Sequence, residues 1–452
     1  MTTRHSGKRW LTAALLLVTL LAAACAGGAA STQDRATPAP AASPTPSSEV
    51  AGAVATPEML PVTPVNINYE IADPAFEALP AARAIFGEYE GAGYQIEVPD
   101  AWNGQVVYYA HGFRGNPPAL TVSFPPLRDY FIAHGYAWAA SSYSRNGYEP
   151  GAAARDTLAL RDVFAEKVGR PSKSYIYGQS MGGHVVALSL EQYPTAYDGA
   201  LSECGVVAGH EVLDYFLSWG ALSAYFAGVD LHGLTTDAQA FGSTISGRIA
   251  PALGTLEEPT DAGRAFADAI VNLTGGERPF FREGYAGNYA FNFAILVNAV
   301  GNAGPSNAAA QNVDTIYKID DGFGVTSEQL NREVSRISAN ITYRDASRYP
   351  EFADMTGRIE RPHLTLHGTG DLFVPIALEA SYRKIVDGAG RGDLLVQRAV
   401  RRAGHCAFSD AERTRAFDDL VDWVATGNKP AGEDLTGDLR DAGRVFTDPL
   451  EP

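Results

Sequence analysis

The sequence predicts an α/β fold built on a mostly parallel sheet, and three observations support this prediction. Short, entirely apolar runs, such as 106–110, are typical of strands that are buried on both faces of a parallel sheet. Stretches with helical spacing follow several of these runs; over 151–168, apolar side chains gather on one side and charges on the other. Of the 452 residues, 46% are hydrophobic, which is enough for a large core. Because βαβ crossovers produce such alternation, the strands should run parallel.

The expected elements follow one another along the chain with one long interruption. The predicted strands are 106–110, 136–140, 174–177, 200–202, 363–366 and 394–396. The predicted helices are 151–168, 181–193, 376–387 and 409–425. The segment 205–355 is too long to be a connection, so we expect a largely helical cap or lid with a small core of its own. A separate domain is the alternative, but the strand–helix pattern restarts afterwards, so 67–204 and 356–452 should complete one sheet.

The N-terminus has the features of an export signal. Residues 1–24 combine basic residues with an apolar run that is shorter than the ~20 residues needed to cross a bilayer. The end of this run resembles a bacterial lipobox, which implies that Cys25 is lipidated; ordinary cleavage near Ala24 is the alternative. Residues 25–66 are mostly Ala, Pro, Ser and Thr and are predicted to be a flexible tether. We expect an exported protein whose membrane contact, if any, is a lipid anchor at Cys25.

Charge and cysteine content exclude several classes of function. The chain carries 35 basic and 52 acidic residues, a net charge of −17, whereas nucleic-acid binding requires a basic face. Its three cysteines are too few for a disulfide scaffold, and their spacing fits no zinc motif. The sequence therefore predicts no nucleic-acid partner, no metal and no cofactor.

A candidate nucleophile lies between a predicted strand and a predicted helix. Residues 178–183 read Gly-Gln-Ser-Met-Gly-Gly, which contains the G-x-S-x-G pattern around Ser180. At such a sharp turn, side chains at positions 178 and 182 would collide with the neighbouring strand and helix. The helix that begins near Met181 also directs free N–H groups toward the serine. The alternative is a glycine-rich turn with an inert serine.

This segment resembles the nucleophile turn of α/β-hydrolases, and the resemblance extends over roughly 82–204 and 356–427. It implies a triad in the chain order serine, acid, histidine. His405 lies after the last predicted strand, where the family places its histidine base. Residues 366–375 resemble the family's H-G-x-x-D-x-x-V-P segment, which implies that Asp371 is the acid. Glu203, at the end of the fourth predicted strand, is the rival acid, and a helix-capping role is the alternative for Asp371.

The resemblance also implies an oxyanion hole. His111-Gly112-Phe113, at the end of a predicted strand, resembles the family's H-G-x motif. The backbone N–H groups of Phe113 and Met181 would then point at the developing oxyanion. His111 itself is expected to bond to backbone and shape this loop.

The cysteines are predicted to tie the histidine loop. With Cys25 lipidated, Cys204 and Cys406 remain as one pair, and in this fold both would lie at the carboxyl edge of the sheet. Tannase-like and feruloyl-esterase-like hydrolases also tie their histidine loop through a cysteine. Their partner cysteine directly precedes the serine, where this chain has Gln179.

The residues and the resemblance together imply an extracytoplasmic serine hydrolase that cleaves small-molecule carboxylic esters through an acyl-enzyme. A serine exopeptidase or an acyltransferase would use the same fold, and a non-catalytic surface lipoprotein is the alternative from another class. Tyr143, Phe373 and Trp219 are predicted to line an apolar substrate pocket, with burial in the cap core as the competing interpretation. The sequence does not indicate an oligomeric state.

Overall fold

The computed structural model describes residues 58–59, 67–231, 237–302, 305–345 and 354–449. The predicted signal peptide 1–24, the predicted lipidation site Cys25 and most of the predicted tether lie outside the described residues. The two tether residues that are described, Glu58–Met59, form strand β1 and pair in parallel with β10 (Ile337–Ser338). This end of the tether is therefore paired with another strand.

One eight-stranded sheet organises the chain, in the order β12-β11-β9-β8-β5-β7-β4-β3. The strands are β3 Ala82–Tyr89, β4 Ala92–Pro99, β5 Gln105–Ala110, β7 Ala137–Ser141, β8 Lys173–Gln179, β9 Gly199–Glu203, β11 His363–Gly368 and β12 Leu395–Val400. β4 runs antiparallel to both of its neighbours, and the remaining pairs are parallel. This order is that of the α/β-hydrolase fold, so the predicted fold class is confirmed. All six predicted strands are present.

The sequence analysis missed the pair β3–β4 because β4 carries polar residues inside a fully buried strand. The buried Glu97 accepts hydrogen bonds from Trp138 Nε1 at 2.7 Å, from Leu79 N at 2.6 Å and from Arg128 Nε at 2.7 Å. Because these donors form hydrogen bonds with the carboxylate, the core can accommodate its charge. A search for short, entirely apolar runs cannot detect such a strand.

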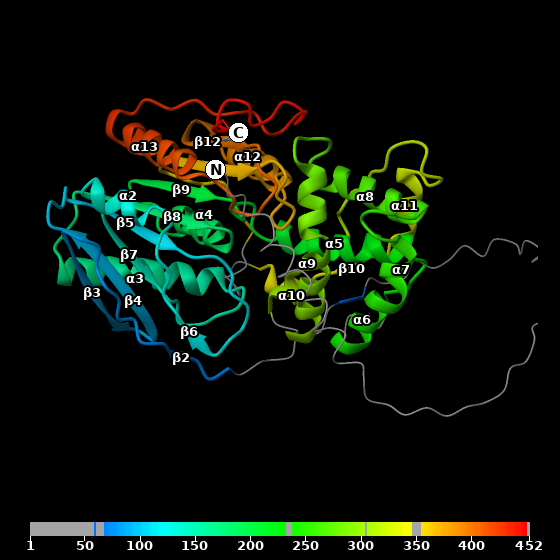
Figure 1. Ribbon diagram of the computed structural model, residues 1–452, viewed down its shortest axis with the longest axis horizontal. Helices are drawn as coiled ribbons and strands as arrows, with labels where there is room; N and C mark the ends of the chain where they lie inside the picture. The colour runs from blue at the N-terminus through cyan, green and yellow to red at the C-terminus, as the bar shows by residue number, and fades with distance from the viewer. Residues whose placement is uncertain (1–57, 60–66, 232–236, 303–304, 346–353, 450–452) are drawn as a thin grey trace, which may run out of the picture. The chain divides into compact units, whose positions relative to one another are not determined.

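Helices cover both faces of the sheet (Figure 1). The helices of the core are α2 Arg128–Ala133, α3 Pro150–Lys167, α4 Met181–Gln192, α12 Ala377–Gly388 and α13 Asp410–Thr426. Residues of α3, α4 and α12 share one apolar cluster with Tyr108 and Ile176, whereas those of α2 and α13 pack with Val107 and Tyr177. Alternate residues of β5 and β8 thus point to opposite helical layers, as expected for a parallel sheet that is buried on both faces.

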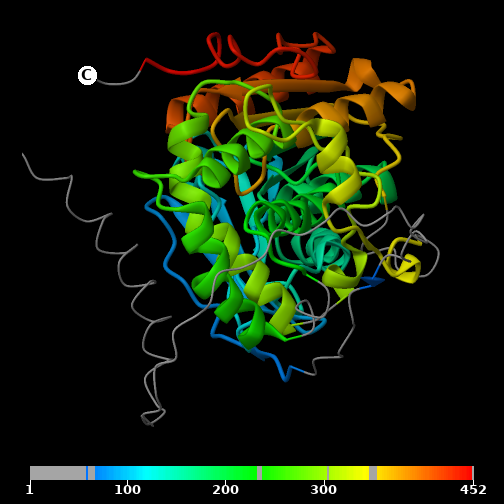
Figure 2. The same ribbon diagram turned by 90° about the vertical axis from the view of Figure 1, so that its right-hand side faces the viewer.

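The segment between β9 and β11 is largely helical, as predicted (Figures 1 and 2). It contains α5 Glu211–Phe226, α6 Ala238–Thr244, α7 Ala250–Leu253, α8 Asp261–Leu273, α9 Phe281–Asn302, α10 Pro305–Ala309 and α11 Ser327–Glu333. We call these helices the cap. Their apolar side chains form a cluster around Trp219 and Phe266, to which Leu372 of the sheet domain also contributes. Among the described residues, no helix is both long and apolar enough to span a membrane.

Candidate active site

Ser180 lies on a strained turn that its neighbouring glycines make possible. It connects β8 directly to α4 and has φ 57° and ψ −121°, a conformation that costs a non-glycine residue about 1–3 kcal/mol. A Cβ at Gly178 would lie 2.2 Å from the carbonyl oxygen of Gly182, and a Cβ at Gly182 would lie 2.0 Å from that of Ala110. Both glycines are therefore required by close backbone contacts, as the sequence predicts.

The loop after β5 brings backbone N–H groups to the serine. A Cβ at Gly112 would lie 3.0 Å from the Cβ of Ser180 and 3.5 Å from its Oγ, so the loop touches the serine directly. The N–H groups of Phe113 and Met181 form no hydrogen bond within the part of the chain that the structure describes. Free donors beside a serine hydroxyl are what an oxyanion hole requires.

His111 supports this loop and does not act as a base. Its Nδ1 lies 2.8 Å from the carbonyl oxygen of Gly112, and its Nε2 lies 3.4 Å from that of Ser142. Burial, together with the charge of Arg114, lowers the pKa of His111 to about 3, so the ring stays neutral. The Tyr143 ring stacks on it at 3.9 Å, and the Tyr143 hydroxyl donates to the His111 carbonyl oxygen at 3.0 Å.

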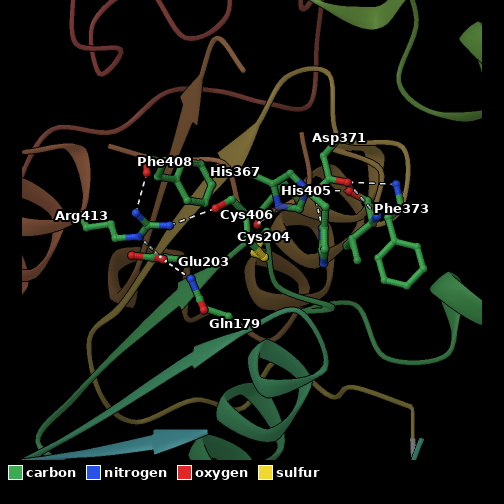
Figure 3. Close-up of a disulfide and its surroundings, with 12 residues drawn as sticks. Gln179, Glu203, Cys204, His367, Asp371, Phe373, His405, Cys406, Phe408 and Arg413 are labelled. Atoms are coloured by element: carbon green, nitrogen blue, oxygen red, sulfur yellow. Dashed lines mark hydrogen bonds and ion pairs between the residues drawn. A yellow bond between two sulfur atoms is a disulfide. The ribbon is translucent and has the colours of Figure 1, made fainter. Parts of the chain in front are cut away.

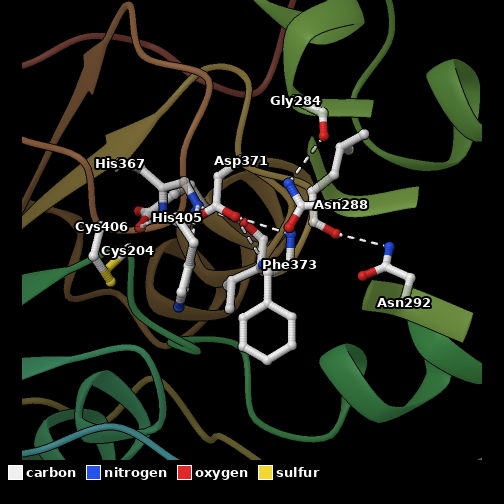
Figure 4. Close-up of polar contacts among 12 residues, drawn as sticks. Cys204, Gly284, Asn288, Asn292, His367, Asp371, Phe373, His405 and Cys406 are labelled. Atoms are coloured by element: carbon white, nitrogen blue, oxygen red, sulfur yellow. Dashed lines mark hydrogen bonds and ion pairs between the residues drawn. A yellow bond between two sulfur atoms is a disulfide. The ribbon is translucent and has the colours of Figure 1, made fainter. Parts of the chain in front are cut away.

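Asp371 binds the ring of His405. His405 Nδ1 donates to Asp371 Oδ2 at 2.7 Å, and the carboxylate is fully buried (Figure 4). Asp371 Oδ1 accepts from the N–H groups of Phe373 and Val374 at 2.9 and 3.1 Å. Burial raises the pKa of the Asp371 carboxyl, but the charge and hydrogen bond of His405, with smaller contributions from His367 and Val374, hold it below its ordinary value. Asp371 thus caps the turn and orients the imidazole at once.

The rival acid, Glu203, is not beside His405. Its buried carboxylate accepts from Gln179 Nε2 at 2.8 Å and from Arg413 Nε at 3.2 Å (Figure 3). Burial raises the pKa of Glu203 above its ordinary value, although Arg413 and Gln179 act against this. Arg413 also donates to the carbonyl oxygens of Cys406 and Phe408. Glu203 therefore anchors the arginine that holds the histidine loop.

A disulfide between Cys204 and Cys406 confirms the predicted pairing and ties the histidine loop to the end of β9. The two Cα atoms are 5.2 Å apart. Ser180 N donates to the carbonyl oxygen of Glu203 at 3.1 Å, so Cys204 follows a residue in contact with the serine. A ring nitrogen of His405 lies within 4.8 Å of both sulfur atoms. His405 Nε2 has no hydrogen-bond partner among the described residues and is free to act toward a hydroxyl or a substrate.

We predict that loss of this disulfide slows catalysis more than it disrupts the fold. A Cys204→Ser/Cys406→Ser variant should retain the sheet, because Arg413 still holds the loop. Its kcat should fall about 10- to 100-fold, because small misplacement of a catalytic group has effects of this size. Reductant should slow the wild type to a similar degree and leave the double variant unaffected. A wild type whose hydrolytic activity is unchanged after complete reduction, verified by thiol titration, would contradict this prediction.

Of the three predicted substrate-binding residues, only Phe373 lies beside His405. The Phe373 ring packs edge-on against the His405 imidazole at 4.8 Å, and Figure 4 shows the two rings side by side. Phe291 of α9, 41% exposed, contacts Phe373 at 4.8 Å, and the sequence analysis did not single it out.

The burial of Tyr143 and Trp219 contradicts their predicted role in substrate binding. Tyr143 is 1% exposed and is occupied in supporting His111. Trp219 is completely buried in the cap, where its ring packs against Phe266 at 5.2 Å and Tyr285 at 5.8 Å. Both are core residues, because their full burial leaves no surface for a ligand.

The cap docks on the turn that carries Asp371, which the sequence analysis did not foresee. Tyr215 Oη and Asn292 Nδ2 both donate to the carbonyl oxygen of Leu372, at 2.7 and 3.1 Å. A Cβ at Gly284 of α9 would lie 1.7 Å from the carbonyl oxygen of Gly370, so the helix and the turn meet backbone to backbone. The only sequence signal for this contact is a glycine within a helix.

The chain has recognisable but distant relatives. No model of a known protein family matches it. It is similar to the o-phthalyl amidase of Xanthobacter agilis, with 23% identity over 407 residues that cover 76% of this chain and 87% of the amidase. Among solved structures, it is similar to feruloyl esterase B from Aspergillus oryzae, with 13% identity and a TM-score of 0.43 over 81% of this chain and 86% of the esterase. A second esterase from the same organism has 14% identity and a TM-score of 0.42, over 77% of this chain and 80% of that one. The strand order, the antiparallel β4 and the serine turn between β8 and α4 together identify the α/β-hydrolase fold in this chain.

Proposed function

We propose that this protein is a serine hydrolase that cleaves carboxylic esters of small molecules through an acyl-enzyme. Ser180 is the nucleophile, His405 the base and Asp371 the acid that orients the base. The observation that carries the proposal is the 2.7 Å bond from His405 to Asp371. The disulfide ties the loop of His405 to Cys204, whose neighbour Glu203 accepts a hydrogen bond from Ser180 N. A hydroxyl on a strained turn, a free imidazole nitrogen and a buried carboxylate are the parts of a nucleophilic triad.

In the proposed reaction, His405 Nε2 takes the proton of Ser180 Oγ as the oxygen attacks the ester carbonyl. The N–H groups of Phe113 and Met181 bind the resulting oxyanion. The tetrahedral intermediate collapses, the C–O bond to the alcohol breaks, and His405 gives its proton to the departing oxygen. Water, deprotonated by His405, then attacks the acyl group and releases the acid and free Ser180.

Amide cleavage is the second candidate, supported by the similarity to an o-phthalyl amidase over most of the chain. An acyl-enzyme forms equally from an amide when His405 protonates the departing nitrogen. The Phe373 ring beside His405, together with the Phe291 ring that contacts Phe373, would suit an aromatic acyl group in either substrate.

A probe and a matched substrate pair test these proposals. A fluorophosphonate probe should label the purified protein at Ser180, as located by peptide mass spectrometry. Phenyl esters and anilides of one aromatic acid then compare the two leaving groups, and we expect the higher kcat/KM for the ester. A higher value for the anilide would replace the esterase by an amidase. No labelling and no turnover would favour the non-catalytic lipoprotein.

We also propose that the protein is exported and anchored through a lipid on Cys25, supported by the basic and apolar pattern of residues 1–24. Expression in a bacterial host with an alkynyl fatty acid should label the wild type, whereas a Cys25→Ser variant should not be labelled. Equal labelling of both, or of neither, would contradict the anchor.

A further inference from the structure

A second buried histidine–carboxylate pair lies behind Asp371. His367 of β11 and Glu379 of α12 are both completely buried, and His367 Nδ1 lies 3.2 Å from Glu379 Oε1. His367 Nε2 lies 4.0 Å from Asp371 Oδ2, the same oxygen that accepts from His405. Figure 3 shows His367 beside the Asp371–His405 pair. The catalytic steps proposed above do not use His367 or Glu379.

The hydrogen bonds of this pair favour one charge state. His367 Nε2 lies 2.8 Å from the carbonyl oxygen of Val374, which can only accept, and Nδ1 faces Glu379 Oε1. The other carboxylate oxygen, Oε2, already accepts from Thr365 Oγ1 at 2.7 Å and from Gln397 Nε2 at 2.5 Å. An ionised carboxylate can accept from both of these donors, and an imidazolium can donate from both nitrogens; unlike His111, which faces two neutral carbonyl oxygens, His367 has a carboxylate as one of its acceptors.

The pKa directions agree with this reading. Burial lowers the pKa of His367, but the hydrogen bond and charge of Glu379, with Asp371 and Val374, hold it above its ordinary value. Burial raises the pKa of Glu379, but His367, Thr365 and Gln397 hold it below. Both directions favour a buried imidazolium–carboxylate ion pair, in which His367 is the member that lies near Asp371.

We propose that His367, held cationic by Glu379, is a positioning residue that extends the triad: its charge keeps Asp371 ionised and restrains protonation of His405. This inference rests on the proposed triad. The imidazolium lies between Glu379 and Asp371, so it is closer to Asp371 than the Glu379 carboxylate is. The ion pair as a whole therefore produces a positive potential at Asp371. A positive potential opposes a second positive charge on His405.

Other polar groups near this chain of charges do not replace His367. Arg278, from the cap, is near Asp371, but its guanidinium is fixed on the Thr369 and Gly276 carbonyl oxygens and the Thr274 hydroxyl. The Tyr215 hydroxyl also faces Asp371, and it donates to Leu372. Beside Glu379 are His363 and Tyr382, which bond to each other at 3.1 Å. All of these groups remain in the variants below, His363 excepted where it serves as the control.

Glu379→Gln is the clean test, because it removes the charge without removing a hydrogen bond. The amide oxygen can accept from Thr365 and Gln397 while the amide nitrogen donates to a neutral His367. We expect the acidic limb of the pH profile of kcat/KM to move upward by about 0.5 pH unit, with little change on the plateau. His367→Gln leaves Glu379 unpaired and should move the limb further, by about one pH unit.

His363→Gln is the matched control, because His363 is an equally buried histidine on the same strand, four residues before His367. It should leave the acidic limb in place. A loss of kcat at every pH without movement of the limb in Glu379→Gln would overturn the inference and leave a purely structural pair. If His367→Gln fails to fold, Glu379→Gln carries the test by itself.

An NMR titration separates this inference from the proposed function. In a Ser180→Ala background, which needs no turnover, the His405 ring should take up its proton at higher pH when Glu379→Gln is added. An unchanged titration would overturn the inference even in an active enzyme. A shifted titration in a protein without hydrolytic activity would uphold the electrostatic coupling while the proposed function fails.

Discussion

Replacement of Ser180 by alanine is expected to lower kcat/KM for ester hydrolysis by about four to six orders of magnitude, since members of a nucleophilic triad act as a unit. Without Oγ no acyl-enzyme can form, and only the free N–H groups of Phe113 and Met181 remain to stabilise an attack by water. Alanine also fits the turn at φ 57° no worse than serine, so the melting temperature should change little.

Ser189→Ala is the matched control for this experiment, because Ser189 is a fully buried serine on the helix that follows the nucleophile. Steady-state kinetics with a p-nitrophenyl ester and circular-dichroism melting of both variants provide the comparison. Full activity in Ser180→Ala, or loss of activity in Ser189→Ala alone, would remove Ser180 from the mechanism.

Replacement of Asp371 by asparagine should lower kcat about 10⁴-fold while preserving the fold. The amide oxygen can still accept from the N–H groups of Phe373 and Val374, so the turn keeps its cap. The amide nitrogen then faces His405 Nδ1 and donates to it, which places the ring proton on Nε2. A protonated Nε2 cannot take the proton of Ser180.

The control for the turn is Asp198→Asn. Asp198 also caps backbone, accepting from Ser174 N at 2.9 Å, but it lies near the amino end of β8, away from the serine. The Asp198→Asn variant should have a lower free energy of unfolding than the wild type and an unchanged kcat. If Asp371→Asn retained wild-type kcat, the acid would have to be sought elsewhere, with Glu203 as the first candidate.

Sequence reasoning predicted the proposed triad and the observed disulfide because each residue lies in a short segment at the end of a strand. In a parallel sheet such segments converge on one edge, so Ser180, Asp371 and His405 could be grouped without knowing any distance. The charge network around them could not be found this way. His367 was visible only as a histidine at a strand end, and its meaning depends on Glu379, which a different element presents.

The burial of individual side chains was, after the charge network, the second property that the residue types did not reveal. An aromatic residue in a cap can line a pocket or fill a core, and Trp219 and Tyr143 do the latter. Glu97 is the opposite case, a charged residue within a buried strand, which is why β3 and β4 went unnoticed.

The contact between Gly284 and Gly370 couples helix α9 to the turn that carries Asp371. With no side chain between α9 and the turn, lifting this part of the cap would pull on the loop that holds the acid in register with the imidazole. A side chain at either glycine would therefore displace the acid-bearing turn as well as the helix, so the two segments can accept changes only together.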